Sequence, residues 1–246
     1  MKPWQLGAVG CAAYVIALIA MAPATLLDSR LDGESSGRLR LAEAQGTIWA
    51  GKAQLTIIKG SGREAVTAGS VSWHVMPQSL LGGHLRFSVQ LGASQFPVTL
   101  SFVQVDIANA EWHFPASALA LLVPRLAPLE LGGDMLLTIP ALSLKAGAVH
   151  GNAVLHWRNA NSALTAGTRL GDYELLIESN GNLYQAALRT ANGPVDLTGR
   201  GSWPRGSAPM LTVTARVPAS LRAQLAPALR LISVEGRDGS FEIRLK

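Results

Sequence analysis

The feature that most constrains the fold of this chain is a strict two-residue alternation of apolar and polar side chains. It is clearest in residues 84–91, where the apolar positions are Leu85, Phe87, Val89 and Leu91. The same period returns in residues 173–178, 211–217 and 241–246. Because successive side chains of a strand point to opposite faces, this period predicts antiparallel strands with one face on a core and the other in water.

Residues 6–27, close to the amino terminus, contain no charged side chain. Their number matches the roughly 20 residues that an α-helix needs to cross a hydrocarbon core of ~30 Å. Lys2 precedes this segment, and acidic residues outnumber the single Arg30 in residues 28–34. Since basic residues favour the cytoplasmic side, we expect residues 6–27 to be a single transmembrane anchor, with residues 1–5 in the cytoplasm and the bulk of the chain outside it.

A cleaved signal peptide is the alternative to a retained anchor. Ala22 and Ala24 are small residues of the kind found at a cleavage site, but Pro23 between them is unfavourable for a signal peptidase. The apolar segment also exceeds the 7–15 residues that are typical of a signal-peptide core. We therefore favour a retained anchor, and under either interpretation the rest of the chain is exported.

The strand-rich part of the chain contains two series of similar short sequence phrases, one after the other. Residues 115–119 (Pro-Ala-Ser-Ala-Leu) and 218–222 (Pro-Ala-Ser-Leu-Arg) each open a Leu- and Ala-rich stretch that lies between two strands and is typical of a short helix. These helices would extend to about residues 126 and 232. Upstream phrases also correspond, in the pairs 46–51 and 147–151, 71–73 and 155–157, and 83–85 and 171–173.

We therefore expect a mainly β protein, in which a curved antiparallel sheet is built from two similar β-rich halves, residues 44–140 and 141–246, each with a short helix. Residues 28–43 would link this sheet to the transmembrane helix. One half alone would have little core, so the two halves would share one continuous sheet. Chance similarity between short β-rich phrases is the alternative to an internal duplication.

Residues with catalytic or metal-binding chemistry form no informative pattern. The five histidines show no His-Glu-x-x-His motif and no helical i, i+4 pair. The only cysteine, Cys11, lies in the apolar segment, so the exported part has no disulfide and no cysteine nucleophile. The 21 basic and 16 acidic residues are dispersed, so nucleic acid is not an expected partner. The sequence predicts a protein that is not an enzyme and has no catalytic, metal or cofactor site.

Five of the six tryptophans lie in or beside predicted strands, namely Trp49, Trp73, Trp112, Trp157 and Trp203. We expect them to be core side chains beneath the short helices, because aromatic rings bury much apolar area. An exposed platform for a partner is the alternative, and Trp49 is its best candidate because glycines flank it. The candidate partner-binding residues are therefore Gly46, Trp49 and Gly51.

Residues 46–51 (Gly-Thr-Ile-Trp-Ala-Gly) are similar to the Gly-Thr-aliphatic-Trp-x-Gly signature of type II secretion system protein N. Their position, some twenty residues after a single amino-terminal apolar segment, is similar as well. Further matching phrases follow in order at residues 71–73 with Pro77, 80–82, 171–173, 190–195 and 197–203. Each phrase is short, but in order and spacing the chain resembles this family over nearly its whole length.

The resemblance implies a bitopic protein of the cell inner membrane with its main domain in the periplasm. The family is an accessory part of the machine that moves folded proteins out of the periplasm through an outer-membrane secretin. It implies no enzymatic activity and no cofactor, and it carries over no catalytic residues. We expect a scaffold or assembly module whose partners are other inner-membrane subunits of type II secretion and the secretin, contacted through sheet edges or loops.

The main alternative is a periplasmic groove protein for lipid or another hydrophobic ligand, anchored to the inner membrane. The apolar face of the curved sheet would then hold an acyl chain, and the lining residues would be Leu85, Phe87, Val89, Leu91, Tyr173 and Leu175. Full burial of these side chains would favour the scaffold, and an open apolar face would favour the groove. A third alternative, an exported hydrolase, would need a polar cluster in a cleft.

Overall fold

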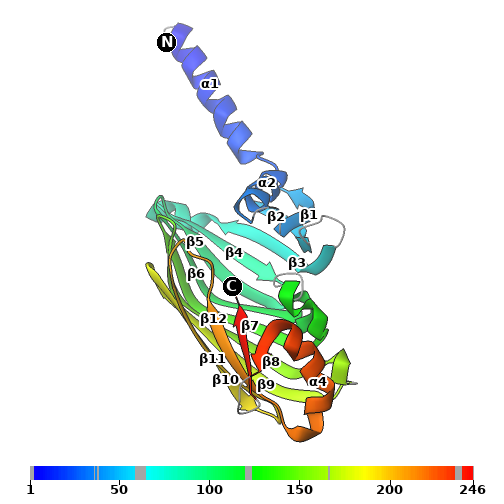
Figure 1. The fold of residues 1–246 in the computed structure, drawn as a ribbon. Helices are drawn as coiled ribbons and strands as arrows, with labels where there is room; N and C mark the ends of the chain where they lie inside the picture. The colour runs from blue at the N-terminus through cyan, green and yellow to red at the C-terminus, as the bar shows by residue number, and fades with distance from the viewer. Residues whose placement is uncertain are drawn as a thin grey trace.

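The protein is built around one large antiparallel sheet, which Figure 1 shows as a curved surface. The computed structural model describes residues 3–35, 37, 39–58, 65–119, 124–165, 167–235 and 240–245. Within these residues the sheet has 14 strands, in the order β1 to β12 followed by β14 and β13. Each strand up to β12 therefore pairs with the next one along the chain, and the predicted mainly β, antiparallel fold is confirmed.

The strands are longest in the middle of the sheet. Their bounds are β1 Leu39–Gly46, β2 Ala50–Ile58, β3 Ala65–Met76, β4 Leu85–Leu91, β5 Ser94–Leu100, β6 Gln104–Pro115, β7 Leu131–Lys145, β8 Ala148–Ser162, β9 Arg169–Asn180, β10 Leu183–Asn192, β11 Asp196–Pro204, β12 Leu211–Arg216, β13 Ser233–Glu235 and β14 Phe241–Leu245. The described α-helices are α1 Pro3–Ala20, α2 Thr25–Glu34 and α4 Ala219–Ile232. Short 3-10 helices are η1 Pro77–Gly82, η2 Ala116–Ala118, η3 Pro124–Leu129 and η4 Ala163–Thr165.

The strand register separates an apolar face from a polar face. Leu155 of β8 lies opposite Leu175 of β9, and directly opposite residues of antiparallel strands point to the same side. We call the side that carries Leu155 and Leu175 the inner face and the other side the outer face. The next pair along the same two strands, His156 and Glu174, lies on the outer face, where the two side chains are 3.7 Å apart.

Helical segments cover the inner face at some places and leave it half-open at others. Next to α4, the buried core includes Leu225 and Phe241, of which Phe241 is completely buried. A second cluster forms around Met135 beside η2, and a third forms around Trp73 near α2. Between these clusters, inner-face side chains such as Leu175 are only half-buried.

The amino-terminal apolar segment folds differently from the prediction. The predicted span continues to Leu27, but α1 ends at Ala20, and α2 begins at Thr25 after a connection that contains Pro23. Proline has no backbone N–H and disfavours the helical conformation at the preceding residue. None of the helices in the described residues is long and apolar enough to cross a membrane. α1 projects away from the sheet in Figure 1.

The expected linker, the boundary between the two halves and the two short helices can each be compared with the observed elements. Residues 28–43, expected to be a linker, contain the end of α2 and the beginning of β1. The expected boundary between the halves at residue 140 lies inside β7, so both halves contribute to one continuous sheet. The second predicted helix is α4. The first predicted helix corresponds to η2 and η3, and residues 120–123 between them lie outside the described residues. Of the expected cytoplasmic residues 1–5, residues 1–2 lie outside the described residues as well. The internal duplication stays a prediction.

Candidate functional site

The turn between β1 and β2 meets the connection between α1 and α2. The candidate residues in and beside this turn are Gly46, Trp49 and Gly51. The indole Nε1–H of Trp49 donates a hydrogen bond of 2.8 Å to the carbonyl oxygen of Ile19. Two backbone hydrogen bonds of 2.9 and 3.1 Å join residues 46–48 to residues 22–24. We call this contact between residues 19–24 and 46–49 the helix–sheet joint, since it fixes α1 and α2 to the sheet.

Both glycines of this turn are required by close packing. Gly46 has a φ of 91°, and a Cβ there would lie 2.4 Å from the carbonyl oxygen of Ala50. At Gly51 a Cβ would lie 2.5 Å from the ring of Trp73, whose indole N–H donates to the Thr47 carbonyl at 3.2 Å. The glycines therefore allow a buried tryptophan to pack against the turn. Their role in binding a partner stays a prediction.

The beginning of the free edge of β1 is covered by α2 and by Ser35, which follows it. The Leu41 backbone N–H donates to the Asp28 carboxylate at 2.7 Å, and the Leu39 N–H donates to the Ser35 hydroxyl at 3.0 Å. Exposed N–H groups of an edge strand are the template on which another strand can pair. We expected partners to be contacted through sheet edges or loops. Since these two donors already have partners within the chain, strand addition at residues 39–41 would require these side-chain hydrogen bonds to break.

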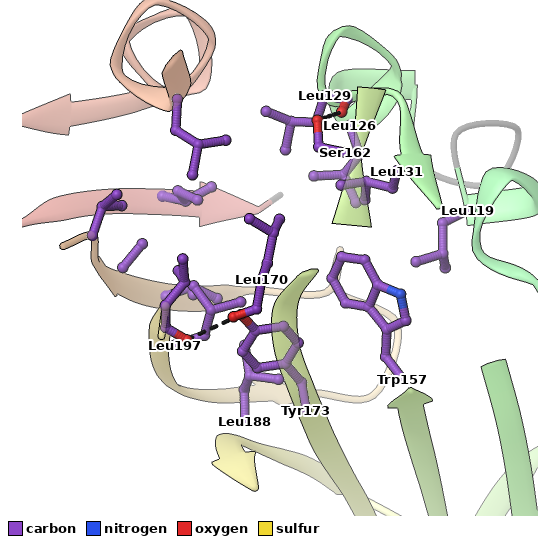
Figure 2. A pocket seen from close by; sticks show the side chains of 16 residues that line it. Leu119, Leu126, Leu129, Leu131, Trp157, Ser162, Leu170, Tyr173, Leu188 and Leu197 are labelled. Atoms are coloured by element: carbon purple, nitrogen blue, oxygen red, sulfur yellow. Dashed lines mark hydrogen bonds between the residues drawn. The ribbon is translucent and has the colours of Figure 1, made fainter. Parts of the chain in front are cut away.

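An apolar cavity lies at the opposite end of the sheet, beneath α4. Its volume is about 160 Å³. Figure 2 shows side chains from several elements around it: Trp157 of β8, Tyr173 of β9, Leu188 of β10 and Leu129 of η3. α4 contributes Leu225. The cavity therefore depends on the return of α4 onto strands that precede it by tens of residues.

The polar atoms in the cavity wall already have partners. The Tyr173 hydroxyl lies 3.0 Å from the carbonyl oxygens of both Leu170 and Val195. The Ser162 hydroxyl donates to the Leu129 carbonyl, and the Trp157 N–H to the Gly132 carbonyl. Burial raises the pKa of Tyr173, and the charges of two nearby aspartates raise it further, so this phenol stays neutral. The wall presents an apolar surface, which suits an apolar ligand.

Comparison with known families identifies the family to which this architecture belongs. The family model for type II secretion system (T2SS), protein N, matches residues 37–244. The chain belongs to this family. The predicted resemblance is confirmed, and it implies a role in type II secretion. The matched range contains nearly the whole sheet and the cavity, whereas α1 and α2 precede it. Neither the curated proteins nor the solved structures gave a significant match to the chain.

The six residues that we expected to line a groove all lie on the inner face of the sheet, but their side chains differ in burial. Tyr173 is 3% exposed and belongs to the cavity wall. Phe87 and Val89 pack against the cluster around Trp73. The other three are half-buried, namely Leu85, Leu91 and Leu175. The inner face is thus closed near α4 and partly open across the central strands.

The tryptophans of the sheet mostly serve the core. Trp73 is buried, and Trp112 and Trp157 pack against the cluster around Met135, which confirms the core interpretation for these three. Trp203 stacks on Tyr184 with ring centres 5.8 Å apart. Trp49, the expected exception, is half-buried and uses its N–H within the chain.

Sequence reasoning overlooked one phrase that resembles a nucleophile motif, Gly-Glu-Ser-Ser-Gly at residues 33–37. In a serine hydrolase the central serine stands on a sharp turn from a strand into a helix. Here Ser35 follows the end of α2 and bonds to the backbone of Leu39, so its hydroxyl has a structural role. In the part of the chain that the structure describes, no three His, Cys, Asp or Glu side chains could together hold a metal ion.

The cavity residues were missed for a different reason. Apart from Tyr173, Trp157 and Ser162, the wall is made of aliphatic side chains that any buried strand or helix would carry, such as Leu188 and Leu197. Alternation shows that these residues face one side of the sheet, but it does not show where α4 covers that side. The amphipathic pattern of residues 219–232 was the available signal.

Proposed function

We propose that this protein is an accessory, non-catalytic scaffold of the type II secretion machinery. Its sheet would stand in the periplasm, and α1 would anchor it to the inner membrane in a single pass, with the amino terminus in the cytoplasm. Family membership over residues 37–244 supports the assignment to type II secretion. The scaffold role and the membrane topology go beyond what family membership implies.

The anchoring part is supported by the apolar side chains that α1 exposes. Tyr14 is 65% exposed, and Val15, Leu18 and Ile19 are exposed as well. Met21, directly after the end of α1, is 76% exposed. Apolar surface in water is unfavourable by about 25 cal/mol per Å², and contiguous exposed patches of this kind mark contact surfaces. A lipid bilayer would cover these side chains. Lys2 before the segment and the acidic residues after it favour a cytoplasmic amino terminus.

The observation that carries the scaffold proposal is the helix–sheet joint. A scaffold has to hold its docking surface at a defined place relative to the membrane, and a flexible linker would not do so. Instead of a linker, the Trp49 indole, two backbone hydrogen bonds and the α2 contacts join the anchor segment to β1. The partners we propose are inner-membrane subunits of the secretion machinery and the secretin.

Deletion of the gene tests the proposed function. We expect secreted enzymes to accumulate in the periplasm of the deletion strain and to be released again when the intact chain is supplied. A version whose residues 1–24 are replaced by a cleavable signal peptide should reach the periplasm but restore little secretion. A version in which an unrelated single-span anchor of the same orientation replaces residues 1–18, so that the joint residues 19–24 are kept, is the matched control and should restore secretion. Normal secretion in the deletion strain would contradict the proposal.

A further inference from the structure

We propose that the cavity beneath α4, together with the inner face that leads to it, binds the acyl chain of a membrane lipid. This inference goes beyond the scaffold function and rests on the proposed anchoring only for the source of the lipid. Three observations carry it: the chemistry of the cavity wall, the apolar path across the central strands, and the character of the sheet end nearest α1.

The cavity wall selects for a ligand without polar atoms. Its few polar groups, the Tyr173 hydroxyl, the Ser162 hydroxyl and the Trp157 N–H, are bonded to backbone carbonyls. An extended peptide would bring backbone N–H and C=O groups that find no partner there, which is unfavourable. An apolar cavity of about 150 Å³ stays free of water and binds small hydrocarbons. The cavity of about 160 Å³ in this protein is thus large enough for the end of a hydrocarbon chain.

The inner face continues the cavity as an apolar path. From the wall residues Trp157 and Tyr173, the next pairs along β8 and β9 are Leu155 with Leu175 and Ala153 with Ile177, and all four of these are half-buried. A leaflet of the ~30 Å hydrocarbon core is about 15 Å deep, which equals four to five strand residues at ~3.3 Å each. A chain that ends in the cavity would therefore extend past Leu175 to about Ile177.

The path points toward the end of the sheet from which α1 departs. In a meander, alternate turns lie at one end, so the β1–β2, β5–β6 and β7–β8 turns share an end, and α4 lies at the other (Figure 1). The β5–β6 turn exposes Phe102 completely and Val103 to 67%. The neighbouring β7–β8 hairpin carries exposed Lys145, and the Arg205 guanidinium donates to the Ala146 carbonyl. Exposed apolar tips beside cationic side chains complement a bilayer surface with anionic head groups.

Site-specific photo-cross-linking in the full chain in its membrane tests the proposal. Leu175 and Leu176 are adjacent, chemically identical and both half-buried, but they face opposite sides of the sheet. A p-benzoylphenylalanine residue placed at position 175 should yield, after irradiation, a protein mass increased by one acylated lipid. The same residue at position 176 should yield only background. The adduct mass then distinguishes a phospholipid from a free fatty acid, and either one supports the proposal.

Two outcomes would overturn it. One is a cross-link from position 175 to another protein, which would make the inner face a protein-docking surface. The other is lipid labelling that is equal at positions 175 and 176, or absent at both while each variant is folded and membrane-bound. A second pair guards against a local packing defect: Leu188 of the cavity wall against Ala187, which is exposed on the outer face of the same strand. Because the readout is an adduct mass, it is independent of whether secretion requires the protein.

Discussion

The two ends of the strand order both carry helical segments, but these segments are held in different ways. At β1, α2 is attached through defined atoms, such as the Leu41 N–H and the Asp28 carboxylate at 2.7 Å. Beside β12 and β14, α4 is attached by apolar packing around Phe241 and leaves a cavity of about 160 Å³. Hydrogen bonds are directional, whereas apolar burial is not. The attachment of α2 therefore fixes its position relative to β1, and the attachment of α4 leaves space for a ligand.

The largest expected effect lies at the apolar end. Phe241→Ala removes a completely buried ring, and such truncations lower the free energy of unfolding by about 3–5 kcal/mol because a cavity remains. The measurement is denaturant-induced unfolding followed by tryptophan fluorescence. Phe102→Ala removes the same ring from a fully exposed position and should change the free energy of unfolding by no more than about 0.5 kcal/mol. Equal effects of the two changes would refute the assignment of Phe241 to the core.

The next effect concerns the turn of the helix–sheet joint. Gly51→Ala places a Cβ 2.5 Å from the Trp73 ring, so we expect a loss of about 1–3 kcal/mol from overpacking. Gly33→Ala is the control, because nothing lies within 4 Å of a Cβ in that helix, and alanine there should be neutral or stabilising by about 0.5–1 kcal/mol. Thermal unfolding of both variants checks the prediction, and an unchanged midpoint for Gly51→Ala would contradict it.

A smaller effect separates the two acidic residues of α2. Asp28→Ala leaves the part-buried Leu41 N–H without its acceptor, which we expect to cost about 1–2 kcal/mol. Asp32→Ala removes an ion pair with Arg40, whose side chain is half-exposed, and exposed pairs contribute about 0–1 kcal/mol. Hydrogen exchange of the Leu41 amide should accelerate in Asp28→Ala and stay slow in Asp32→Ala. The reverse order would show that the ion pair holds α2 in place.

The smallest effect at neutral pH is expected at Tyr173. Tyr173→Phe removes one hydroxyl bonded to two carbonyls and should cost about 0.5–1.5 kcal/mol. The pKa of Tyr173 is raised by burial in the folded protein. Its contribution to stability is therefore present below the unfolded pKa of about 10 and is lost as the pH rises through the folded pKa. Urea midpoints above pH 10 should fall more steeply for the wild-type chain than for Tyr173→Phe, and parallel curves would contradict this.

The strands could be predicted because their signal is local. Residues 84–91, 211–217 and 241–246 of the alternating pattern correspond to β4, β12 and β14 within one or two residues. The end of α1 could be anticipated only in part, since Pro23 marks a break, but the capture of residues 22–24 by the β1–β2 turn is a contact between segments that are distant in the sequence. The cavity was beyond sequence reasoning for the same reason, because it is made by α4 folding back over β8 to β10.

The neighbour-to-neighbour order of the strands also affects how the chain folds. If the chain becomes available for folding in order from its amino terminus, each strand from β2 to β12 can pair with the strand that precedes it. This keeps contacts local and favours rapid folding. Only the last pairing departs from this rule, because β14 must insert between β12 and β13 after α4 has formed. The cavity beneath α4 is therefore expected to form last, when the carboxy-terminal residues of β14 join the sheet.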